Sequence, residues 1–125
     1  MISPCLTYLD MHAAMADLQD HFGLDVVWLG DDAAEIRWHG GVAVAQTDRP
    51  DELHGTHVGH GWTYVQVDDP DTHCAHALER GAGVLNAPHS TPDGRQRGYT
   101  ARDREGNLWT FALGVFGNGV LPAPA

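Results

Sequence analysis

Residues 99–111 have the sequence YTARDREGNLWTF. Apolar and aromatic side chains flank a polar centre, which predicts two strands, over 96–103 and 107–113. Between them, Arg104-Glu105-Gly106 forms a turn, because glycine adopts the positive φ that a tight turn needs. The sequence therefore predicts a β-hairpin just before a Gly- and Pro-containing tail.

The N-terminal part of the chain predicts a strand, a helix and three more strands. A strand at 2–9 precedes Asp10, whose carboxylate can cap a helix, and Gly23 stands where a left-handed residue would end it. Apolar residues recur with helical period between these two positions. They are Met11, Ala14, Met15, Leu18 and Phe22. The strands that follow are expected at 24–29, 34–39 and 42–47.

The same order of elements begins again after a polar segment rich in Gly and His. A strand at 62–67 leads to a helix that Asp68 or Asp69 caps, with Pro70 in its first turn and Gly81 at its end. A weak strand near 84–85 and the hairpin complete this second copy. Asp10 and Gly23 are 13 positions apart (23 − 10), as are Asp68 and Gly81 (81 − 68). The matched spacing indicates an internal duplication.

The hairpin resembles the last hairpin of the glyoxalase and bleomycin-resistance proteins, the vicinal oxygen chelate superfamily. The pattern there is Asp-Pro-(Asp/Glu)-Gly-Asn before an apolar strand, and Arg104 replaces the proline here. The segments at 6–10, LTYLD, and 65–68, VQVD, also resemble the family. The resemblance implies an α+β fold: two paired βαβββ modules form a curved, barrel-like mixed sheet around a cleft, with the helices outside. It covers one domain, 1–114, with modules at 1–47 and 62–114, a linker at 48–61 and a tail at 115–125.

Length and charge restrict the function. The 125 residues fit one domain, and 42% of them are hydrophobic, as in folded proteins. The chain has 17 acidic residues, seven arginines and no lysine, with a net charge of −10. This balance argues against nucleic acid and anionic membranes as partners and favours a cationic ligand. Five acids fall in loops that we expect to border the cleft: Asp31, Asp32, Asp48, Asp51 and Glu52.

The expected cellular location is inferred from the targeting and membrane-spanning signals that the sequence lacks. No apolar run is long enough to span a membrane, and no signal peptide is visible. The two cysteines, Cys5 and Cys74, are isolated, which is typical of a reducing compartment. We therefore expect a cytoplasmic protein.

Catalytic members of the family hold a divalent ion with His, Gln or Glu from both modules. The resemblance puts the equivalent positions at Ser3, Ala45 or Gln46, Trp62 and Thr110. Only Gln46 could bind a metal, and one ligand does not hold a catalytic ion. We therefore expect no metal, no cofactor and no catalytic residue.

Histidine and cysteine leave alternatives open. His54, His57 and His60 recur in the linker, and His73 and His76 lie on the second helix. Such tracts can bind metals, but we interpret all five as solvated surface groups. We interpret Cys5, which we place near the cleft, as a buried, inert residue rather than a nucleophile.

Alternation along the strands assigns the faces of the cleft. Trp62, Tyr64 and Gln66 should face it from one strand, and Leu108, Thr110 and Ala112 from another. On the first module we expect Ala43 and Ala45 in the cleft. Gln46 would face the cleft instead if the strand register were shifted by one residue. Trp38 should lie at the mouth of the cleft, and Arg102 is preferred over Tyr99 as a polar anchor. The expected ligand-binding residues are Trp62, Tyr64, Trp38, Gln46, Ser3, Cys5, Thr7, Thr110, Leu108 and Arg102.

The resemblance favours the bleomycin-resistance branch, whose members are typically homodimers. It implies reversible, non-catalytic binding of an antibiotic-like small molecule, cationic and partly aromatic, in clefts between two copies. The first alternative is a metal-dependent enzyme of the same superfamily, a glyoxalase-like lyase or isomerase or a dioxygenase, that uses Gln46 with linker histidines. The second alternative is an interaction module without a small ligand.

Overall fold

The computed structural model describes residues 2–50 and 55–114. The first module contains β1 (Cys5–Tyr8), α1 (Met11–Phe22), β2 (Asp25–Trp28), β3 (Ala33–Trp38) and β4 (Gly41–Thr47). The second contains β5 (Trp62–Gln66), α2 (Pro70–Glu79), β6 (Gly83–Val84), β7 (His89–Ser90), β8 (Gln96–Arg102) and β9 (Leu108–Gly114). The predicted order is present in both halves, and β7 is an addition that the sequence did not predict. Asp51, Glu52, His54 and the tail at 115–125 lie outside the described residues.

Local signals place both helices. The Asp10 carboxylate accepts a hydrogen bond from a backbone N–H in the first turn of α1, and Gly23 ends this helix at φ +69°. Asp69, rather than Asp68, caps α2, and Pro70 occupies the first turn as expected. These interactions act within one helical turn, which is why the sequence alone predicts them.

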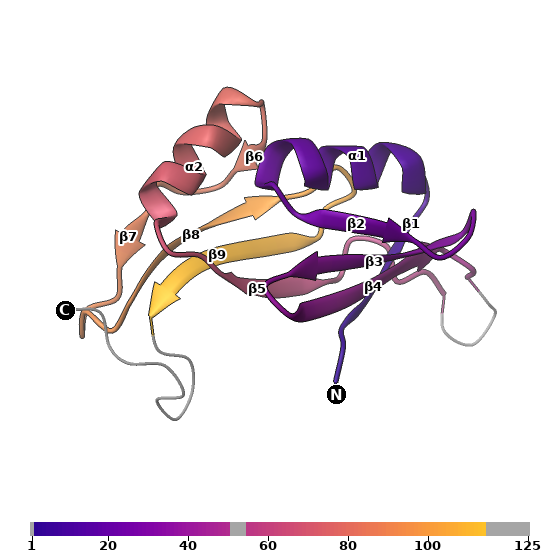
Figure 1. The fold of residues 1–125 in the computed structure, drawn as a ribbon, viewed down its shortest axis with the longest axis horizontal. Helices are drawn as coiled ribbons and strands as arrows, with labels where there is room; N and C mark the ends of the chain where they lie inside the picture. Colours follow the sequence, from indigo (N-terminus) through magenta and orange to yellow (C-terminus); the bar gives the residue numbers. More distant parts are fainter. Residues whose placement is uncertain (1, 51–54, 115–125) are drawn as a thin grey trace.

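Each module forms its own sheet. The strand orders are β1-β4-β3-β2 and β5-β9-β8-β6, with β7 added beside β8. The β1–β4 and β5–β9 pairs are parallel and the others antiparallel, which makes both sheets mixed. The predicted α+β class is confirmed. The sheets do not close into a barrel: both helices lie on one side of them (Figure 1). Neither helix in the described part of the chain is long and apolar enough to cross a bilayer.

The helices define a buried face on each sheet. The residues that α1 buries are those of the predicted apolar stripe, and they pack in one core with Leu6, Tyr8 and Ile36. Ala43 and Ala45 belong to this core, because Ala43 pairs with Ile36 and Ala45 with Leu6. Placing these two alanines in the cleft was therefore wrong, and their strand neighbour Gln46 lies on the opposite face.

A buried carboxylate joins the two modules. Oδ2 of Asp103, just after β8, accepts hydrogen bonds from the Tyr8 hydroxyl at 2.6 Å and from Trp109 Nε1 at 3.0 Å. The Asn107 side chain donates to the same oxygen, and the backbone N–H groups of Glu105 and Asn107 donate to Oδ1. Because every partner is a donor, an ionised carboxylate satisfies the whole set. Burial and the Asp103 charge raise the pKa of Tyr8, which stays protonated and donates.

Further contacts extend this junction. The Glu105 carboxylate accepts from the backbone N–H groups of Leu9 and Asp10, at the start of α1. At the other end of the junction, Trp38 Nε1 donates to the Gln66 carbonyl at 2.6 Å. The first module thus holds the second through Trp38 at the end of β3, and the second holds the first through the turn between β8 and β9.

We expect the Asp103→Asn variant to unfold more easily. One oxygen becomes an NH₂ group, which cannot accept the hydrogen bonds made there, so buried donors lose their partners. The free energy of unfolding should fall by about 3 kcal/mol, measured by urea denaturation. Asp31→Asn, at an exposed position, is the matched control and should change it by less than about 0.5 kcal/mol. Equal stability of the two variants would contradict this role for Asp103.

Candidate functional site

The outer face of the second sheet, opposite α2, presents an aromatic pair. Along β5, Val65 is buried toward the helix, while Trp62 and Tyr64 point the other way and are 59% and 50% exposed. Their rings stack, with centroids 5.6 Å apart and planes at 23°. Two large apolar side chains with this much exposed surface provide a flat area on which a planar molecule can stack.

Hydrogen bonds fix the orientation of the Trp62 ring. Its Nε1 donates to Thr110 Oγ1 at 2.9 Å, and Thr110 and Thr100 share a hydrogen bond of 2.8 Å. A hollow of about 180 Å³ lies beside the pair, and its wall includes Asn86 and His89. The indole is therefore held in place before any ligand arrives, which lowers the entropy that binding costs.

The strand register extends this surface. Leu108 pairs with both Trp62 and Arg102, and Thr110 pairs with both Tyr64 and Thr100. Directly paired residues share a face of a sheet. The structure thus brings five of the expected ligand-binding residues to one face: Trp62, Tyr64, Leu108, Thr110 and Arg102.

The other expected residues are distributed elsewhere. Thr7 pairs with Gln46, and both lie with Cys5 on the outer face of the first sheet. Cys5 is exposed, so its interpretation as buried was wrong. Ser3 precedes β1 and is half-buried. Because the two sheets lie side by side, the expected cleft residues are divided between two surfaces.

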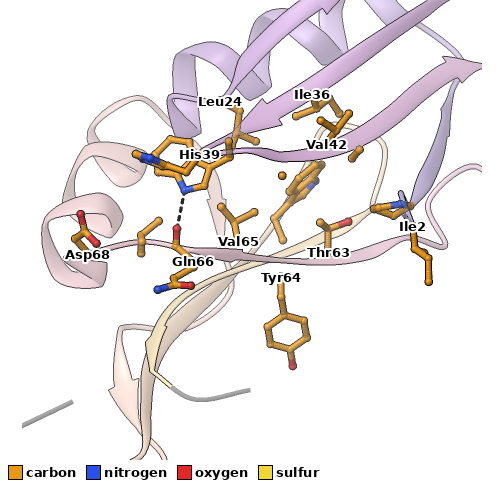
Figure 2. A pocket seen from close by; sticks show the side chains of 16 residues that line it. Ile2, Leu24, Ile36, His39, Val42, Thr63, Tyr64, Val65, Gln66 and Asp68 are labelled. Carbon is orange, nitrogen blue, oxygen red and sulfur yellow. Dashed lines mark hydrogen bonds between the residues drawn. The ribbon is translucent and has the colours of Figure 1, made fainter. Parts of the chain in front are cut away.

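Trp38 lines a different space, a cavity of about 600 Å³ between the modules. Figure 2 shows this cavity between the strands of the first sheet and β5, with Val65 and Thr63 on its side of β5 and Tyr64 directed away from it. The indole of Trp38 closes one part of the cavity through its hydrogen bond to the Gln66 carbonyl. Trp38 is therefore separated from the Trp62–Tyr64 pair by β5.

His73 was misinterpreted as a surface group. Its Nε2 lies 2.9 Å from the Phe22 carbonyl at the end of α1, and its Nδ1 lies 2.6 Å from the Tyr99 hydroxyl. A carbonyl only accepts, so Nε2 carries the proton and Nδ1 accepts from Tyr99. Burial lowers the pKa of His73 and raises that of Tyr99, which favours this neutral arrangement. Helical spacing could have revealed it, since His73 lies three residues after the buried Pro70 and four before the buried Ala77.

His76 is exposed, in agreement with the surface interpretation, although its Nε2 lies 3.0 Å from the Asp20 carbonyl. Among the acids expected near the cleft, Asp32 and Asp48 are engaged locally. The Asp32 carboxylate accepts from Thr47, and the Asp48 carboxylate accepts from Thr56. Asn86 and His89 beside the aromatic pair were not predicted, because nothing in a loop and a two-residue strand marks them in the sequence.

The side chains at the positions implied for a metal do not suit one. An indole cannot act as a ligand, and the Trp62 ring is hydrogen-bonded to Thr110, which stands at a second implied position. Within residues 2–50 and 55–114, no three His, Cys, Asp or Glu side chains are grouped so that they could hold an ion. The donor set thus does not fit the metal chemistry that the resemblance implies for catalytic members.

The sequence at residues 4–111 matches the family model of the Glyoxalase/Bleomycin resistance protein/Dioxygenase superfamily. The chain belongs to this superfamily. No curated protein matches the sequence significantly. The superfamily resemblance predicted from the hairpin is thereby confirmed, whereas its bleomycin-resistance branch stays a prediction.

Solved structures of the superfamily fold superpose on most of the chain. TioX from Micromonospora sp. ML1 is 26% identical, with 94% of this chain and 98% of that chain covered and a TM-score of 0.72. A lactoylglutathione lyase from Agrobacterium tumefaciens is 23% identical, with 91% and 92% covered and a TM-score of 0.72. A virulence protein from Salmonella typhimurium is 16% identical, with 92% and 97% covered and a TM-score of 0.73. The latter two likenesses concern the fold alone.

We expect His73 to make stability depend on pH. Its pKa in the folded chain lies below the ordinary value of 6.5, so the unfolded chain binds this proton at a higher pH. The stabilisation is complete above about pH 6.5 and is lost as the pH falls through the folded pKa. Thermal unfolding of His73→Gln should depend less on pH than the wild type between about pH 5 and 7.5. The control His60→Gln, at an exposed loop position, should behave like the wild type; an identical profile for His73→Gln would contradict the expectation.

Proposed function

We propose that the protein reversibly binds a small molecule with a planar aromatic part and a positive charge, and releases it unchanged. The observation that supports this most is the exposed, stacked Trp62–Tyr64 pair, with the Trp62 ring held by Thr110. Stacking of a third ring on such a pair adds about 0.5–1.5 kcal/mol beyond the burial of its area. A rigid aromatic platform suits capture and requires no reacting group.

Charge favours a cationic guest over an anionic one. The net charge of −10 produces a negative potential around the whole molecule, which raises the local concentration of cations and their rate of association. Arg102, on the same outer face, is the one predicted contact that carries positive charge. We assign it to a polar or anionic substituent of the guest.

A second copy of the chain would complete the site. The hollow of about 180 Å³ beside Trp62 is smaller than the roughly 300–1,000 Å³ of drug-sized ligand pockets. In the homodimer that we propose, the outer face of one copy covers the outer face of the other around a two-fold axis. The linker at 48–61 offers enough chain for the modules to be exchanged between copies.

The biological role we propose is sequestration of an antibiotic-like compound in the cytoplasm, as in the bleomycin-resistance branch. A metal-dependent isomerase or dioxygenase activity is less well supported, because the residues at the implied ligand positions do not suit an ion. A role as an interaction module without a small ligand is also less well supported, because it does not explain why the indole of Trp62 is held in place.

We expect the planar cation proflavine to bind to the aromatic pair. Replacing Trp62 by Ala should weaken this binding by more than about tenfold, or ~1.4 kcal/mol, measured by the fluorescence of the dye. The matched control is Trp28→Ala, because Trp28 is also part-exposed at 39% but stacks on His12 of α1. This control should keep wild-type affinity.

The same titration tests the alternatives. Dialysis against EDTA should leave the affinity for proflavine unchanged. Equal affinity of the Trp62→Ala and wild-type proteins would remove the pair from the site. A stoichiometric bound metal whose removal abolishes turnover of a substrate would replace the binding function by an enzymatic one.

A further inference from the structure

The cavity between the modules exists because β1 is short. β4 begins at Gly41, but its pairing with β1 begins only at Val44, opposite Cys5. β5 is the edge strand of the second sheet. The first residues of β4 and the edge of β5 therefore face a space that no strand of the described residues fills. Its volume of about 600 Å³ lies within the range of small-molecule sites.

Both modules supply apolar walls to this cavity. Leu24 and Ile36 come from the first module, and Val65, Val67 and Trp109 from the second. In Figure 2 Leu24, Ile36 and Val42 lie on one side and Val65 on the other. These walls favour a guest with an apolar body, since burial contributes about 25 cal/mol for each Å² of apolar surface.

One polar atom of the cavity wall lacks a partner. The hydroxyl Oγ1 of Thr63 is buried and makes no hydrogen bond to any described residue. Thr63 lies on the cavity side of β5 (Figure 2). A buried hydroxyl without a hydrogen bond costs about 1–3 kcal/mol, so a guest with a polar group at this depth would remove that cost.

The ends of the cavity differ in charge. The carboxylate of Asp68 marks one end and the apolar side chain of Ile2 the other (Figure 2). Asp68 makes no hydrogen bond or ion pair that involves another described residue, whereas the neighbouring Asp69 is occupied in capping α2. From Thr63 to Gln66, the last residue of β5, the strand advances about 10 Å, at ~3.3 Å for each of three steps, and Asp68 follows two residues later. A molecule with an apolar body and a basic group at one end matches this arrangement.

We propose that the inter-module cavity is a second ligand site, separate from the Trp62–Tyr64 face, for a small aromatic amine whose ammonium group pairs with Asp68 and whose ring lies between Ile36 and Val65. The site does not depend on the function proposed above. Tyr64 borders both spaces, but Trp62 lines the outer hollow and Thr63 lines the cavity, so substitutions at these two residues test the two sites independently.

The test uses two probes of one shape, 2-naphthylmethylamine and the neutral 2-naphthylmethanol, titrated calorimetrically into the full-length protein. Thr63→Phe fills the cavity and should weaken both probes by about tenfold or more. Asp68→Asn should weaken the amine by about three- to tenfold and the alcohol by less than about twofold. Asp31→Asn, another exposed acid, is the control for charge, and every titration is made in the Trp62→Ala background, which removes the aromatic platform of the outer face. The Asp31→Asn control should bind the two probes within about twofold of this parent protein.

Several results would overturn the inference: no saturable binding of either probe, unchanged affinity in folded Thr63→Phe, or equal effects of Asp68→Asn on amine and alcohol. Loss of binding of both probes in Trp62→Ala would assign them to the outer face and would also overturn the inference. If Thr63→Phe does not fold, Asp68→Asn still decides the outcome through the difference between the two probes. Failure here would leave the proflavine result at Trp62 unaffected.

Discussion

The arrangement of the two modules depends on one buried carboxylate. Asp103 accepts hydrogen bonds from Tyr8 of the first module and from Trp109 of the second at a single oxygen. Such a group is costly to bury unless all its partners are in place. It therefore specifies one relative position of the modules, and the Glu105 carboxylate adds two backbone contacts to the start of α1.

This fixed junction determines where a guest can bind. Both helices lie on one side of the sheets (Figure 1), which leaves the outer faces for recognition. The outer face of the second sheet carries the aromatic pair. Between the modules, the short β1 leaves the first residues of β4 without a partner from it, and the cavity lined by Trp38 and Val65 lies between them and the edge of β5. Two candidate binding sites thus follow from one packing arrangement. Neither brings together a set of metal ligands among the described residues.

The sequence predicts features whose causes are local. Asp10, Gly23 and Pro70 act within one helical turn, and the alternation of β5 assigns Trp62 and Tyr64 correctly to the face away from the helix. It fails on β4, GVAVAQT, because apolar residues occupy both faces and no period of two distinguishes Ala45 from Val44. The environments of Cys5 and His73 depend on residues distant in sequence. The Tyr8 partner of Asp103 is 95 positions away, so the hairpin motif could not reveal this contact.

The central claim is that an intact, rigid frame presents the outer face of the second sheet to planar cations. A crystal structure of the protein with proflavine tests this claim most directly. The account predicts the acridine ring stacked on Trp62 and Tyr64, with the Trp62–Thr110 hydrogen bond of 2.9 Å retained. A dye bound elsewhere, with this face unoccupied in every copy, would contradict it.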